Sequence, residues 1–122
     1  MLDDVCSPTR IKAILSKYPN LHLSIAHLGG FQYEELMGID AYYNLSAILP
    51  DLVNRVGIET TNKILRDFGV DRLVFATDYP ENRSIAAASI YDTYFDILGQ
   101  MDFSQEEAEK ICKWNALKMV GL

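Results

Sequence analysis

The sequence predicts an α/β fold in which three parallel strands are covered by helices. Apolar residues recur at helical spacing in several segments, and three short apolar segments between them each end in polar residues. Helical and strand-like segments alternate in the order α-β-α-β-α-β-α-α, which is typical of a parallel sheet built by right-handed crossovers. No linker, repeat or low-complexity segment interrupts the 122 residues, so we expect a single domain.

The first helix is predicted to begin at Ser7 and to end before Pro19. Ser7 is a suitable N-cap, the proline that follows it is favoured at the first helical position, and apolar residues then repeat at helical spacing. Residues 21–27 are largely apolar and lead into Gly29. This pattern indicates a buried strand that runs into a loop at its carboxyl end.

The middle of the chain is predicted to hold a short helix, a second strand and a long helix. Residues 33–38 are expected to be helical, and residues 41–46 are rich in aromatic residues that favour strands. Residues 52–68 have apolar positions at helical spacing, with Gly57 as the predicted interruption and Gly69 as the predicted end.

A third strand and two further helices complete the predicted order. Residues 73–78 form the strand, and residues 87–101 have an apolar face at helical spacing. Ser104 and Glu107 have the spacing of a capping box, which predicts the start of the final helix. Cys112 falls on the apolar stripe of that helix, so we expect its thiol to be buried.

The composition is that of a globular protein with an acidic surface. Hydrophobic residues make up 49% of the chain, charged residues 23%, and the net charge is −6. Without a basic stripe, nucleic acid and anionic membranes are not expected as partners. The chain also lacks a basic leader and an apolar run of about 18 residues, which predicts a cytoplasmic protein.

Polar residues follow each predicted strand at its carboxyl end, where parallel α/β sheets gather their active groups. An imidazole and a carboxylate at strand ends can together hold a metal ion or polarise a water molecule. A single histidine beside two glycines can equally be a hydrogen-bonded packing residue, so these residues alone leave both interpretations open. The first predicted strand ends in His27, the second in Asn44 and Ser46, and the third in Thr77 and Asp78.

Three segments of the chain resemble successive signatures of the amidohydrolase family, in the same order. They are YPNLHLSIAHLGG at residues 18–30, GVDRLVFATDYP at residues 69–80, and KICKWNA at residues 110–116. The resemblance is to the amidohydrolase-related branch, which contains small-molecule hydrolases and also decarboxylases. It implies that residues 1–122 are a C-terminal fragment of a (β/α)8 TIM barrel, holding the family's strands six to eight with their covering helices.

The same resemblance implies roles for particular residues. His27 would end strand six, where the family places a histidine that activates water or polarises the substrate carbonyl, and Asp78 would end strand eight as metal ligand and general base. Ser46 would end strand seven as a substrate contact. Apart from the resemblance, Asn82 and Arg83 follow Asp78 on a loop suited to bind an acidic substrate, although solvated loop residues of this kind are common. The implied cofactor is a divalent metal, zinc above all.

One departure from the family pattern limits what the chain can do alone. The family's H-x-H pair and its further metal histidine have no counterpart, because His22 and His27 are the only histidines and His22 lies at the start of a strand. A catalytic zinc needs about three protein ligands, and His27 with Asp78 supplies at most two. One expectation is therefore that the chain binds no metal on its own.

Three functions follow from this pattern. The leading hypothesis is a metal-dependent hydrolase that attacks a small carbonyl substrate with metal-activated water. The alternatives are a decarboxylase of the same family and a catalytically silent oligomeric remnant. Three strands cannot close a barrel, so two unpaired edges are expected, and with them a homo-oligomer or association through the open sheet edges.

Overall fold

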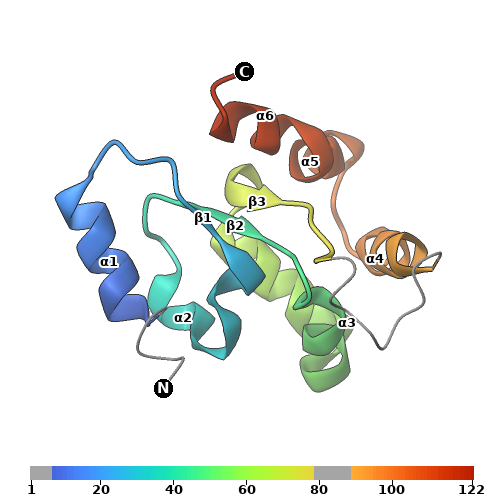
Figure 1. The fold of residues 1–122 in the computed structure, drawn as a ribbon. Coiled ribbons are helices and arrows are strands. Elements are labelled where there is room, and N and C mark those ends of the chain that lie inside the picture. The colour runs from blue at the N-terminus through green and yellow to red at the C-terminus, as the bar shows by residue number, and fades with distance from the viewer. Residues whose placement is uncertain (1–6, 79–88) are drawn as a thin grey trace.

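The computed structural model describes residues 7–78 and 89–122, so the predicted substrate contacts Asn82 and Arg83 lie outside the described residues. Three short parallel strands form one sheet in the order β1-β2-β3 (Figure 1). Their bounds are Ser24–Ile25 for β1, Tyr42–Asn44 for β2 and Leu73–Val74 for β3. The predicted parallel sheet and the alternation of helix and strand are confirmed. The sheet is open, so the eight-stranded barrel stays an implication of the resemblance.

The first helices form where the capping residues predict. Helix α1 (Pro8–Lys17) begins after Ser7, whose side-chain oxygen accepts a hydrogen bond from the backbone N–H of Arg10 at 3.4 Å. The short helix α2 (Tyr33–Leu36) precedes β2. Both therefore match the predicted elements, with α2 shorter than expected.

Helix α3 (Leu49–Phe68) connects β2 to β3 and is broken and ended by glycines. Gly57 has φ +85° inside the helix, and Gly69 ends it with φ +102°. Residues with a side chain adopt such positive φ values only at a cost, so glycine is suited to both positions. The predicted interruption and end are both confirmed.

Helix α4 (Ile90–Gly99) and a final helical run complete the fold. The run consists of α5 (Gln105–Glu109), the π-helical turn η4 (Lys110–Trp114) and α6 (Asn115–Met119). Ser104 and Glu107 form the predicted capping box. The predicted start of α4 at residue 87 lies outside the described residues.

The two faces of the sheet differ in polarity. Ile25, Tyr43 and Leu73 are cross-strand neighbours on one face and are 5%, 1% and 0% exposed. Phe68 of α3 packs its ring 4.5 Å from the ring of Tyr43, so α3 covers this apolar face (Figure 1). Because alternate residues point to opposite faces, Asn44 lies on the other face.

The last helix is hydrogen-bonded to β3 through a buried asparagine and a freed carbonyl. Asn115, 2% exposed, donates from Nδ2 to the carbonyls of Val70 at 2.6 Å and Leu73 at 2.8 Å. In the π-helical turn the N–H of Asn115 bonds to the carbonyl of Lys110, five residues back. The carbonyl of Ile111 is thereby left to accept the N–H of Phe75 at 2.9 Å.

Two expectations about particular residues are wrong. The first strand does not continue to His27, because the chain leaves the sheet after Ile25 and enters the 3-10 segment η2 (Ala26–Gln32). Cys112 is exposed rather than buried, because its neighbour Ile111, 1% exposed, faces the core and successive helical residues point about 100° apart.

Candidate functional site

The chain turns sharply after each of the three strands, and each turn holds a residue with left-handed backbone. His27, Ala47 and Asp78 have φ values of +58°, +57° and +63°, and none of them is glycine. Such conformations cost on the order of 1 kcal/mol or more and persist where the surrounding structure enforces them, often at functional sites. The strands are parallel, so the three turns lie at the same edge of the sheet.

His27 is held through one nitrogen of its ring. Nδ1 lies 2.6 Å from the backbone carbonyl oxygen of Ser46 and 3.1 Å from its hydroxyl oxygen. A carbonyl oxygen can only accept, so Nδ1 carries the proton. In the neutral imidazole the lone pair is then on Nε2, which is the tautomer that can bind a metal ion or accept a proton.

Ser46 is buried behind His27. The Ser46 side chain is 7% exposed, and its hydroxyl donates to Oδ1 of Asn44. The structure thus brings Ser46 and His27 together as predicted strand-end neighbours. The expected contact between Ser46 and a substrate stays a prediction.

Asp78 is exposed after β3, at the far side of β2 from His27. Its charge acts on Tyr94, a fully buried residue of α4 whose hydroxyl donates to the carbonyl of Leu45 at 3.2 Å. Burial raises the pKa of Tyr94 to about 12, and the negative charge of Asp78 contributes to this rise. The carboxylate of Asp78 therefore lies within electrostatic reach of the end of β2.

His27 and Asp78 come from β1 and β3, which do not neighbour each other. By the resemblance His27 ends strand six and Asp78 ends strand eight, so one intervening strand is the expected arrangement. Two strand spacings of about 4.8 Å separate the strands by roughly 10 Å.

Comparison with known proteins decides the family. A family model described as amidohydrolase matches residues 6–122. The chain belongs to the amidohydrolase family. Family membership indicates an enzyme with a hydrolase-type function. No curated protein and no solved structure matches this amidohydrolase chain significantly.

The donors at the carboxyl edge fit a divalent metal in type but not in number. Neutral imidazole and carboxylate both suit zinc, and Nε2 of His27 has its lone pair available. Within residues 7–78 and 89–122, however, no three His, Cys, Asp or Glu side chains are placed to share an ion. A complete zinc site would need ligands from outside these residues.

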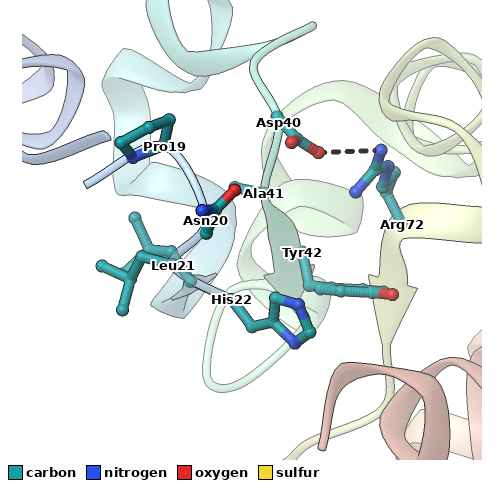
Figure 2. Close-up of a pocket in the computed structure, with 9 residues that line it drawn as sticks. Pro19, Asn20, Leu21, His22, Asp40, Ala41, Tyr42 and Arg72 are labelled. Carbon is teal, nitrogen blue, oxygen red and sulfur yellow. Dashed lines mark ion pairs between the residues drawn. The ribbon is translucent and has the colours of Figure 1, made fainter. Parts of the chain in front are cut away.

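The opposite, amino edge of the amidohydrolase sheet has a polar hollow of about 260 Å³ (Figure 2). Arg72 pairs there with Asp40 at 3.0 Å and lies 5.5 Å from the centre of the Tyr42 ring. His22 bonds through Nδ1 to the backbone carbonyl of Met119 at 3.0 Å. These contacts tie neighbouring segments together, so the predicted structural position of His22 is confirmed.

Asn44 is the residue at the carboxyl edge that sequence reasoning undervalued. It ends β2, and its side-chain oxygen accepts hydrogen bonds from both His27 and Ser46. The spacing of two residues between Asn44 and Ser46 was the available signal, because it marks consecutive polar residues on one face of a strand. Nothing in the spacing, however, showed that both residues would bond to His27.

None of the helices in the described part of the chain combines the length and apolar character needed to cross a bilayer.

Proposed function

We propose that this amidohydrolase chain supplies His27 and Asp78 to the hydrolysis of a small carbonyl substrate such as an amide, an ester or a lactone. One observation carries the proposal. The carbonyl of Ser46 fixes the proton of the neutral His27 ring on Nδ1, which leaves Nε2 as a base and ligand at the functional edge of the sheet. Family membership supports a hydrolase-type reaction.

Hydrolysis forms a bond between water oxygen and the carbonyl carbon, breaks the bond to the leaving nitrogen or oxygen, and moves a proton from the water to the leaving group. Asp78 is an exposed carboxylate that can accept and return this proton. Nε2 of His27 can accept a hydrogen bond from the water or, once protonated, donate one to the carbonyl oxygen. A divalent ion, zinc most readily, would supply an activated water when bound, with Asp78 among its ligands.

The proposal extends to substrate binding. Arg83 and Asn82 follow Asp78 closely in sequence, and a guanidinium at that position would favour a substrate with an acidic group. Ser46 would contribute through its hydroxyl, which borders the ring of His27. The proposed substrate is therefore a small carbonyl compound with a negative charge.

Two other functions remain alternatives. A decarboxylase could use the same pair of residues, because polarising a carboxylated substrate and polarising a carbonyl need similar groups. The second alternative is a catalytically silent oligomeric protein. It is supported by the number of metal donors, because no three His, Cys, Asp or Glu side chains of the described residues are placed to share an ion.

Isotope labelling separates these functions. The chain, with and without added zinc, is incubated in ¹⁸O-water with amides, esters and lactones of small acids. Hydrolysis places ¹⁸O in the product carboxylate, whereas decarboxylation releases carbon dioxide. His27→Gln and Asp78→Asn should abolish the labelling, and His22→Gln is the matched control because His22 lies at the other edge.

Metal content is a second, independent test. The chain is dialysed against zinc and its bound metal is measured by elemental analysis. Bound zinc at one equivalent that is lost in Asp78→Ala, but not in Asp40→Ala, would support the metal-dependent proposal. A chain without zinc and without turnover would favour the silent protein.

We also propose that copies of the chain associate through the sheet, at β1. The carbonyl of Leu73 in β3 and the N–H of Phe75 just after it bond to the final helical run, whereas β2 is the one strand paired with β1 among the residues that the structure describes. An unpaired strand edge is a template for another strand. Light scattering of the chain and of a Ser24→Pro variant tests this, since proline removes a backbone donor from β1.

A further inference from the structure

We propose that Asn44 is a positioning residue that holds the His27 ring in the tautomer with Nε2 unprotonated. Asn44 is the last residue of β2, the central strand of the sheet, and it lies between the turn that holds His27 and the turn that follows β2. Its consequence for catalysis rests on the proposed function, but the tautomer itself does not.

The side chain of Asn44 bonds to both turns. Oδ1 accepts the backbone N–H of His27 at 3.3 Å and the backbone N–H of Ser46 at 3.3 Å, and it also accepts the hydroxyl of Ser46. Nδ2 donates to the hydroxyl oxygen of Ser24 at 3.4 Å. One amide group therefore links two neighbouring strands and both of their carboxyl ends.

The orientation of this amide is fixed by its partners. Backbone N–H groups can only donate, so the atom that faces His27 and Ser46 must be the oxygen. The hydroxyl of Ser46 then has its proton directed to Oδ1, which leaves its lone pairs for the N–H at Nδ1 of His27. The donors and acceptors of the network are consistent at every step.

Asn44 also bonds within two of the three turns whose backbone is strained. His27 and Ala47 both have left-handed φ values near +58° and +57°. Strained residues persist only where other contacts over-determine them, and Oδ1 of Asn44 bonds to His27 itself and to Ser46, which precedes Ala47. The amide thus positions the backbone of His27 directly. Through the N–H of Ser46 it also positions the Ser46 residue, whose carbonyl accepts the hydrogen bond from the His27 ring.

Asn44 acts on the protonation of Nε2 indirectly, through Ser46. Asn44 holds the backbone and hydroxyl of Ser46, and the carbonyl of Ser46 holds the proton on Nδ1 at 2.6 Å. Without the first link the Ser46 turn is free to relax and the carbonyl can leave Nδ1. An unconstrained neutral imidazole favours its proton on Nε2, so the lone pair would move to the wrong nitrogen.

Nitrogen NMR of the histidine rings tests this without any assay of activity. In the full chain at a pH where the rings are neutral, His27 should show a protonated Nδ1 and an unprotonated Nε2. Asn44→Ala should shift His27 toward the opposite tautomer, and Asn44→Asp should preserve the original one because its oxygens accept from the same donors. Ser24→Ala is the matched control, because it removes only the contact to Nδ2.

His22 is an internal reference in the same spectra. Its Nδ1 also bonds to a backbone carbonyl, that of Met119, and no contact joins it to Asn44. Its signals should stay unchanged in every variant that folds. If Asn44→Ala does not fold, Asn44→Gln replaces it, because one added methylene displaces the acceptor and should also shift the tautomer.

Two results would overturn the proposal: an Asn44→Ala or Asn44→Gln variant that keeps the wild-type tautomer of His27, or an Asn44→Asp variant that loses it. Activity gives a separate outcome. With a substrate in hand, Asn44→Ala should lower kcat by about 10- to 100-fold, as loss of an outer hydrogen-bond partner does, and Asn44→Asp should restore most of it. A chain without turnover but with the expected tautomers would refute the proposed function and leave the role of Asn44 intact.

Discussion

The two edges of the sheet use similar residues for different purposes. Each edge has a histidine whose Nδ1 bonds to a backbone carbonyl: His27 to Ser46 at 2.6 Å, and His22 to Met119 at 3.0 Å. At the carboxyl edge the backbone around the histidine is left-handed, and an asparagine amide joins two strand ends. At the amino edge the neighbouring groups are an exposed ion pair and an arginine beside a tyrosine ring.

This difference teaches that residue type alone does not identify a site. The turns at the carboxyl edge keep a strained, left-handed backbone, and this is the edge where parallel sheets place their active groups. A network of polar hydrogen bonds is needed to hold that strained backbone in place. The amino edge has contacts that join segments distant in sequence, such as His22 with Met119, and this is what a stabilising edge requires. Three experiments can break or sharpen this contrast, and a fourth tests an ion-pair cluster that lies outside both edges.

The largest expected effect is on catalysis. His27→Gln should lower kcat/KM by about 100-fold or more, because it removes a group that moves or holds a proton in the transition state. His22→Gln should change kcat/KM by less than about twofold, since it acts only on the stabilising edge. Steady-state rates of the two variants, compared after both have been shown to fold, would break the contrast if the losses were equal.

The second effect is on stability. Asn115→Ala should lower the free energy of unfolding by about 3 kcal/mol, because the buried carbonyl of Leu73 and the part-buried carbonyl of Val70 lose their shared donor. Urea unfolding measures this change. The matched control is Asn20→Ala at the exposed rim of the hollow, for which the expected change is within about 0.5 kcal/mol.

A smaller effect should have the opposite sign. Ala47→Gly should raise the free energy of unfolding by about 0.5 kcal/mol, because glycine removes the cost of φ +57° while adding some entropy to the unfolded chain. Ala13→Gly, in the regular helix α1, should instead lower it by about 1 kcal/mol. Thermal unfolding of the two variants measures both changes in stability. A lower stability of Ala47→Gly than of the wild-type chain would argue against strain at this turn.

The smallest effect is an acid dependence that belongs to neither edge. Arg66 bonds to Glu107 at 2.7 Å, and this hydrogen bond, together with the one from the backbone N–H of Ser104, lowers the pKa of Glu107 from 4.5 to about 2. The stabilisation is therefore complete above about pH 4.5 and is lost as the pH falls toward 2.

Unfolding measured across this pH range tests the assignment. Glu107→Gln should show a shallower loss of stability with acid than the wild-type chain, because glutamine does not titrate. Asp40→Asn, which removes the exposed partner of Arg72, should keep the wild-type slope. Equal slopes in all three proteins would show that Glu107 is not the titrating group.

The sequence predicted elements where local chemistry decides them. Ser7, Gly57, Gly69 and the pair Ser104 with Glu107 each act through their own backbone neighbourhood, so their signals carried over to the structure directly. The order of helices and strands followed from periodicity for the same reason.

The site depended on contacts that no local pattern contains. The bonds from Asn44 to His27 span 17 residues, and those from Asn115 to β3 span 42. Periodicity also extended the first strand through His27, because an apolar run gives no sign that the backbone will turn left-handed there. The bonds of Asn44 were missed for this reason, whereas Cys112 was misplaced because the apolar stripe did not distinguish it from Ile111, which faces the core. The roles of His27 and Asp78 still rest on the family.

The bond between His22 and Met119 has a practical consequence. It fastens the end of α6 near the start of β1, while Leu122, 84% exposed, extends into solvent at the carboxyl terminus (Figure 1). A label or a surface tether attached after Leu122 would therefore be anchored beside the amino edge. Immobilised in this way, the protein would have the amino edge of its sheet next to the surface and the carboxyl edge, which holds His27, farther from it.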